Sequence, residues 1–220
     1  MKKLNSIKVC ILCILTSILI LSLGNPQWNK YIFIFQSNIF SLYQKDLSGL
    51  LEPSKNYTGP WNQWYNSGEL ACQQNYVSGL LHGESKYYYA SNGIYGVLGK
   101  SGELMLSMTY NKGKITGESV LYSDDGNIDT RTPYLDGKIE GVTTSYYPSG
   151  QIKMEMPYQD NKQHGKAIFY YPSGQIKHQL TYLHGNVLGS VTEYSESGDI
   201  IKQYEVDKNG NKKFITNGSN

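Results

Sequence analysis

A repeat with a fixed period of 24 residues constrains this chain more than any other feature of its sequence. One unit is marked by Gly141, Tyr146, Gly150, Ile152 and Tyr158. The same residue types recur 24 positions later, at Gly165, Tyr170, Gly174, Ile176 and Tyr182. Five columns that share one period identify a repeat array, in which each unit contacts mainly its neighbours.

The array extends in both directions from these two units. Downstream, Gly189 opens a unit in the same phase, and upstream a first unit opens at Gly59. The unit that opens at Gly83 fits only with an insertion of ten residues near 92–100, which we interpret as a longer hairpin tip. The sequence therefore predicts six units between about residues 59 and 211.

Each unit has the pattern of one β-hairpin. Its second half alternates with period two, as strands do. One face of this strand is expected to carry Ile152, Met154, Met156 and Tyr158. Between the halves, Pro148 presets the first inner angle of a turn and Gly150 accepts the left-handed position after it. At about 10 Å per hairpin, the predicted fold class is all-β, an elongated antiparallel meander of six hairpins on the order of 60 Å long.

The motif Tyr-x-x-Gly-Lys-x-x-Gly joins one unit to the next at 110–117 and 134–141. It resembles the MORN repeat, in the variant found in many bacterial proteins, over about two thirds of the chain. In segment 158–165, Asn161 replaces the expected glycine, and asparagine is the non-glycine residue that best tolerates the left-handed conformation. The resemblance implies a non-catalytic protein that binds another protein. Bacterial proteins of this variant are often assigned to the YwqK-type antitoxin family of toxin–antitoxin systems.

Two segments precede the array and one follows it. Residues 1–24 begin with lysines and continue as an uncharged hydrophobic helix over 9–24, which fits either a cleaved signal peptide or a membrane anchor. Because the lysines come first, the array is expected to be exported, as a periplasmic, secreted or membrane-anchored protein. Residues 25–58 are predicted to cap and link the array, with a spacing that favours a helix over a strand. Residues 212–220 are predicted to be a flexible tail.

Charge and cysteine content argue against several functions. The chain has 20 basic and 18 acidic residues and no basic stripe, so we expect no nucleic-acid partner. Cys72 is the only cysteine outside residues 1–24, and its strand position predicts a buried side chain. The four histidines fit turns and strand ends, and neither a Walker loop nor a Gly-x-Ser-x-Gly motif occurs. We therefore expect no catalytic residues, no metal site and no cofactor.

Columns of tyrosines are the remaining candidates for function. The first column is Tyr88, Tyr122, Tyr146, Tyr170 and Tyr194, and the second is Tyr76, Tyr110, Tyr134, Tyr158 and Tyr182. Stacking of these rings between neighbouring hairpins is one interpretation, and exposure in a groove that accepts an extended ligand is the other. A further set of tyrosines stands one position after the first column, and we expect these side chains to face the other way and to be more exposed. They are the candidate partner-binding residues: Tyr65, Tyr89, Tyr147 and Tyr171.

Three functional classes follow from this organisation. The first is a non-catalytic scaffold that binds a partner protein outside the cytoplasm, with an antitoxin-like role, and a toxin as the partner, as its most specific form. The alternative is a cell-envelope module that binds glycan or lipid, with membrane association through residues 9–24. An enzyme would need acid and base residues clustered on one row of hairpins, and the sequence shows no such cluster.

Overall fold

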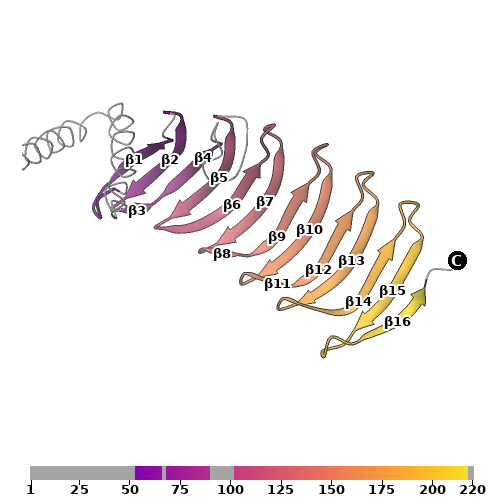
Figure 1. The fold of residues 1–220 in the computed structure, drawn as a ribbon. Helices are drawn as coiled ribbons and strands as arrows, with labels where there is room; N and C mark the ends of the chain where they lie inside the picture. The colour runs from indigo at the N-terminus through magenta and orange to yellow at the C-terminus, as the bar shows by residue number, and fades with distance from the viewer. Residues whose placement is uncertain (1–52, 66–67, 90–101, 218–220) are drawn as a thin grey trace, which may run out of the picture.

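The computed structural model describes residues 53–65, 68–89 and 102–217, which form one continuous antiparallel sheet (Figure 1). The strands follow one another along the sheet in their order in the chain, so the sheet is a meander. In this part of the chain every element is a strand, and no helix is long and apolar enough to cross a membrane. The predicted leader, most of the capping segment and the inserted hairpin tip lie outside the described residues.

Six hairpins make up most of the sheet, as the repeat predicted. They are β1 (Gly59–Trp64) with β2 (Leu70–Val77), β4 (Gly83–Tyr88) with β5 (Leu104–Asn111), β6 (Lys114–Tyr122) with β7 (Ile128–Leu135), β9 (Gly141–Tyr146) with β10 (Ile152–Gln159), β12 (Gly165–Tyr170) with β13 (Ile176–Leu183), and β14 (Asn186–Tyr194) with β15 (Ile200–Val206). Three short strands each pair with the strand before them: β3 (Leu80–Leu81), β8 (Lys138–Ile139) and β11 (Lys162–Gln163).

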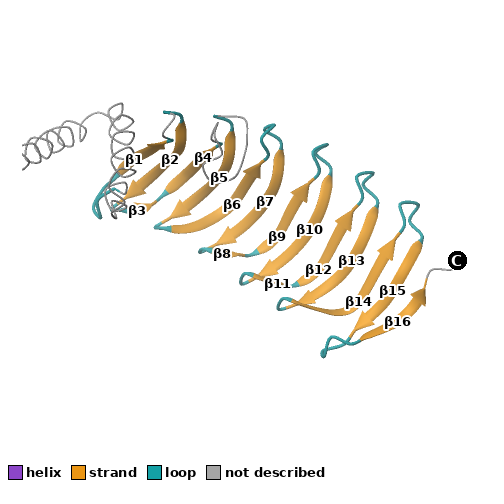
Figure 2. Cartoon of the chain, viewed as in Figure 1, coloured by secondary structure: helices purple, strands orange, loops and turns teal. Residues whose placement is uncertain are grey.

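Two kinds of turn alternate along the chain, and each kind lies at its own long edge of the sheet (Figure 2). Within a hairpin, the turn closes with a hydrogen bond of 2.8 Å from the amide of Gly150 to the carbonyl of Tyr147, and Gly150 has a φ of 83°, as predicted. Between hairpins, two successive residues have positive φ, which is the signature of a type I′ turn. At Asp160 and Asn161 these angles are 49° and 65°, so asparagine does occupy the left-handed position expected for it.

A β-bulge in each hairpin changes which residues share a face. In β10 the register shifts between Ile152 and Met154, so that Ile152 pairs with Tyr146 and Met154 with Ser145. Neighbouring residues of β9 point to opposite faces, and paired residues point to the same face. The predicted alternation is therefore wrong for Ile152, which lies on the face opposite to Met154, Met156 and Tyr158. The extra residue of the bulge, Lys153, is what moves it there.

The tyrosine columns are in register but do not stack ring on ring. Among the described residues, no ring contact joins successive tyrosines of the first column, or successive members of the second column from Tyr110 to Tyr182. A hairpin advances the sheet by about 10 Å, whereas aromatic pairs need centroids about 4.5–7 Å apart, so equivalent rings cannot touch. The stacking interpretation is thus wrong in its geometry, and other contacts must hold successive hairpins together.

The predicted tail after residue 211 contains a further strand. β16 (Lys212–Asn217) pairs with β15 through contacts such as Tyr204 with Phe214. A turn over 207–211 has the same backbone hydrogen bonds as the turn at 147–151, and Gly210 has a φ of 82°. The Asp-Lys-Asn-Gly sequence of this turn was the signal for the extra strand. β16 covers the edge that β15 would otherwise present.

Candidate binding surface

One face of the sheet carries a row of tyrosine–isoleucine pairs beside the turns within the hairpins. We call these pairs the Tyr–Ile row, and its members are Tyr122 with Ile128, Tyr146 with Ile152, Tyr170 with Ile176, and Tyr194 with Ile200. Three of the isoleucines are exposed large hydrophobic side chains: Ile152 by 37%, Ile176 by 36% and Ile200 by 43%. The tyrosines are half-buried. The row therefore offers apolar surface to solvent at the regular spacing of the repeat.

Sequence reasoning missed this row because it placed the isoleucines on the other face. The bulge that brings Ile152 beside Tyr146 recurs in other units, at Phe169/Tyr170 and Glu193/Tyr194. A signal for it was present: in the last four units the turn glycine and the isoleucine are two residues apart, the arrangement of a four-residue turn followed by a bulge.

Polar side chains form hydrogen bonds with the hydroxyls of two tyrosines of the row. The hydroxyl of Tyr170 donates a hydrogen bond of 2.7 Å to Glu155, and the hydroxyl of Tyr194 accepts one from Gln179. Burial, followed by the hydrogen bond to the Glu155 carboxylate, raises the pKa of Tyr170 to about 12. Glu118 and Arg131 form an ion pair on the same face. Charged side chains thus lie on the same face as the exposed isoleucines.

The four predicted partner-binding tyrosines connect successive hairpins. The hydroxyls of Tyr65, Tyr89, Tyr147 and Tyr171 donate hydrogen bonds to the backbone carbonyls of Tyr88, Tyr122, Tyr170 and Tyr194, at 2.6, 2.6, 2.7 and 2.9 Å. Each bond thus ends on the first-column tyrosine of the next hairpin. Tyr89 is only 7% exposed, which is contrary to the exposure expected of it. The contacts give these four residues a structural role, and partner binding by them stays a prediction.

Two of these tyrosines also carry a lysine over the ring. The amine of Lys153 lies 5.9 Å from the ring centroid of Tyr147, and that of Lys177 lies 5.5 Å from that of Tyr171. Both lysines are the extra residues of the bulges, next to Ile152 and Ile176. Positive charge therefore borders the exposed isoleucines along this part of the row.

The opposite face carries the second tyrosine column with methionine and leucine side chains. Met156 is buried there, and a column of small residues beside it is buried in every unit after the first: Ser85, Ser119, Thr143, Ala167 and Val191. Cys72 lies on the same face and is buried as predicted, and burial raises the pKa of its thiol to about 11. Side chains of this face thus cover one another more completely than those of the Tyr–Ile row.

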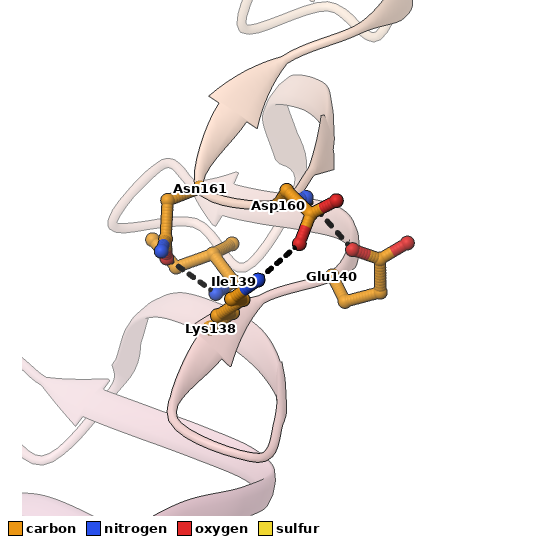
Figure 3. Close-up of polar contacts among 5 residues, drawn as sticks. All are labelled: Lys138, Ile139, Glu140, Asp160 and Asn161. Carbon is orange, nitrogen blue, oxygen red and sulfur yellow. Dashed lines mark hydrogen bonds and ion pairs between the residues drawn. The ribbon is translucent and has the colours of Figure 1, made fainter.

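The turns between hairpins stack on one another through polar contacts (Figure 3). The amine of Lys138 lies 2.6 Å from the Asp160 carboxylate, and the backbone amide of Asp160 donates to the Glu140 carboxylate at 2.8 Å. The side-chain oxygen of Asn161 accepts a hydrogen bond of 2.7 Å from the amide of Ile139. Asn161 therefore does more than permit the turn, because its side chain also binds the preceding hairpin.

Within the described ranges, no group of three or more His, Cys, Asp and Glu side chains is placed to hold a metal ion. The sequence treated the histidines as separate turn and strand residues. The structure brings two of them together, His164 and His184, with ring centroids 4.8 Å apart. This pair was not foreseen, because it depends on how the turn of one hairpin stacks on the hairpin before it.

Comparison with known families identifies two of the units. Residues 139–160 and 163–184 each match the family described as the MORN repeat variant. A comparison with curated proteins found no match. The predicted resemblance is thus confirmed for two neighbouring hairpins. The described part of the chain is therefore an all-β array of hairpins that contains MORN repeats of the variant type at 139–160 and 163–184, an architecture that suggests a repeat-based binding module.

Proposed function

We propose that this protein is a non-catalytic scaffold that binds a partner protein outside the cytoplasm through the Tyr–Ile row. The observation that carries the proposal is the regular exposure of Ile152, Ile176 and Ile200 on one face of the sheet. Large apolar side chains that recur in line on a surface mark interaction sites more often than scattered ones do. The export signal predicted over residues 1–24 supports the location.

The spacing of the row suggests an amphipathic helix as the bound element. Exposed isoleucines of successive hairpins are about 10 Å apart. Seven residues of an α-helix rise by about 10.5 Å, so a helix with an apolar residue in every heptad matches the row. Lys153 and Lys177 border the isoleucines, which favours a partner whose helix carries acidic residues beside its apolar stripe. An antitoxin-like role, in which the partner is a toxin, is the most specific form of this proposal.

The test compares partner capture by matched variants. Ile152→Asp with Ile176→Asp places charge in the row, and Leu121→Asp places charge at a residue of similar exposure, 38%, on the opposite face. Immobilised protein should retain one stoichiometric protein from envelope extract, and only the double variant should lose it. Circular dichroism of all variants checks that they fold. If the double variant and Leu121→Asp retain equal amounts of the partner protein, the Tyr–Ile row is not the binding surface.

A glycan or lipid ligand is the second candidate, because the lysine–tyrosine pairs at Tyr147 and Tyr171 combine an aromatic ring with a positive charge. Cell-wall preparations and vesicles containing anionic lipid test it by sedimentation with the purified protein. Tyr147→Ala and Tyr171→Ala should then weaken sedimentation more than Leu121→Asp does. Sedimentation without any captured protein would favour this candidate over the scaffold.

A further inference from the structure

Two histidines that flank one hairpin lie side by side at the edge where the two-residue turns stack. The ring centroids of His164 and His184 are 4.8 Å apart, with an angle of 54° between the ring planes. His164 stands between β11 and β12, and His184 is the first residue of the turn between β13 and β14. Because β12 pairs with β13, with Gly165 opposite Tyr182, the two rings lie at the open end of one hairpin.

Backbone hydrogen bonds fix both histidines where they are. The amide of His164 donates to the carbonyl of Pro157 at 2.9 Å, and the amide of Gly185 donates to the carbonyl of Gln163 at 2.8 Å. His184 has a φ of 50°, as the first position of a type I′ turn requires. The second of these bonds places the turn of His184 against the strand just before His164.

The equivalent places one repeat earlier also lie close to each other. Glu140 precedes Gly141 as His164 precedes Gly165, and Asp160 begins its turn as His184 does. Figure 3 shows the Glu140 carboxylate beside Asp160, where it accepts a hydrogen bond of 2.8 Å from the Asp160 amide. The repeat thus brings these two places together by construction, and one repeat later both hold an imidazole.

One nitrogen of the pair lacks a partner. Nδ1 of His164 is buried and makes no hydrogen bond within the part of the chain that the structure describes. Buried polar atoms in folded proteins nearly always have a hydrogen-bond partner in the protein or in ordered water, and a nitrogen without a protein partner can bind a water or an ion. His184, whose ring lies against that of His164, is exposed to solvent.

We propose that His164 and His184 form a two-histidine site for a divalent late first-row transition metal ion such as Zn²⁺. Two imidazoles on one ion, each with a metal–nitrogen distance of about 2.0–2.1 Å, have ring centres about 5 Å apart at a tetrahedral angle. The observed separation of 4.8 Å agrees with that value. Imidazole is a favoured ligand of Zn²⁺, Ni²⁺ and Cu²⁺.

Water completes the coordination of this ion. Among the described residues no third His, Cys, Asp or Glu is placed to join the two histidines. A site with two protein ligands binds its ion reversibly, in contrast to closed four-ligand structural sites. Because the ion binds only when β12 and β13 are paired, it stabilises this hairpin increasingly as its concentration rises. This property is independent of the partner proposed above.

The chain contains its own control. His82 occupies the same place before Gly83 as His164 does before Gly165, but the turn of the following hairpin begins with Lys112 in place of a histidine. His82 therefore stands at the same position of the repeat as His164, but with a lysine in place of the second histidine. Asparagine is the replacement for all three histidines, because it tolerates the φ of 50° at position 184.

The experiment is a titration of the untagged full-length chain with Zn²⁺. All proteins carry Cys10→Ser and Cys13→Ser, which remove the only other closely spaced thiols. Calorimetry should detect one saturable site, weakened at least tenfold by His164→Asn or His184→Asn and unchanged by His82→Asn. Zn²⁺ should also raise the melting temperature of the parent and the His82→Asn protein, but not that of His184→Asn. No saturable binding, or equal binding by the parent and His184→Asn, would show that the rings only pack together.

Discussion

The hydroxyl of Tyr147 links two hairpins, and its removal should weaken that link by a measurable amount. It donates a hydrogen bond of 2.7 Å to the carbonyl of Tyr170 in the next unit. A hydrogen bond of this kind contributes about 0.5–1.5 kcal/mol to stability. We therefore expect Tyr147→Phe, which keeps the ring and removes the oxygen, to lower the free energy of unfolding by about 1 kcal/mol. At a urea m-value of about 2 kcal/mol per molar, the midpoint should fall by roughly 0.5 M.

The neighbouring tyrosine gives the matched control. Tyr146→Phe makes the same chemical change one position earlier, where no hydrogen bond from the hydroxyl is found among the described residues. Its urea midpoint should stay near that of the parent. Because each hairpin contacts mainly its neighbours, the effect of Tyr147→Phe should also be local. Amide exchange should accelerate about fivefold in β10 and β12 and far less in β15.

Equal urea midpoints for Tyr147→Phe and Tyr146→Phe would refute the reasoning. That result would mean that the hydroxyl bonds between hairpins contribute nothing, and that pairing of backbones alone joins the units. A large loss in both variants would contradict it too, since it would place the contribution in the rings and not in the oxygen.

Three further predictions concern the turns and the alkaline limit. In Gly185→Ala the new methyl group has no atom within 4 Å, so the free energy of unfolding should fall only by the roughly 1–2 kcal/mol of a left-handed alanine. In Gly79→Ala the methyl group would lie 2.0 Å from the Lys55 carbonyl oxygen, so the loss should be far larger. Thermal melts of the two variants measure the difference. Asn161→Ala loses both the left-handed tolerance and the hydrogen bond to the preceding hairpin, so it should destabilise by about 2 kcal/mol in urea, and Asn161→Gly by less. The pKa of Tyr170 is raised from 10.0 to about 12, so between these pH values the folded chain keeps the hydroxyl proton and the unfolded chain loses it. The free energy of unfolding should therefore fall as pH rises from 10 to about 12. Tyr170→Phe should make the melting temperature fall less steeply over this pH range.

The repeat made most of the fold predictable. Glycine at fixed spacing, proline before it and alternation after it act locally, so Gly150 and its equivalents indicated the hairpins without knowledge of the rest. Asn161 could be placed in a left-handed turn for the same reason. Local chemistry also misled in one respect: the bulge at Lys153 is invisible to a count of alternating residues, and it reversed the face of Ile152.

The candidate surface was harder to predict because it depends on contacts between units. Tyr147 was expected to be free for a partner, but its hydroxyl reaches the next hairpin, a distance that no sequence pattern specifies. His164 and His184 are 20 residues apart, which matches no metal-binding motif in a linear sequence. They meet because the turn of one hairpin stacks on the previous one. Such contacts follow from the way hairpins pack and become visible only in three dimensions.

Removal of one whole unit tests most directly whether the protein is an array of equivalent hairpins. Deletion of residues 165–188 removes 24 residues and brings Gly189 to the place of Gly165. Deletion of residues 165–182 removes a shorter segment and breaks the phase. We expect the first variant to keep the strand signal in circular dichroism, to unfold cooperatively and to shorten by about 10 Å in small-angle scattering. The account would be contradicted if the 24-residue deletion lost its strand signal and cooperative unfolding as completely as the out-of-phase deletion.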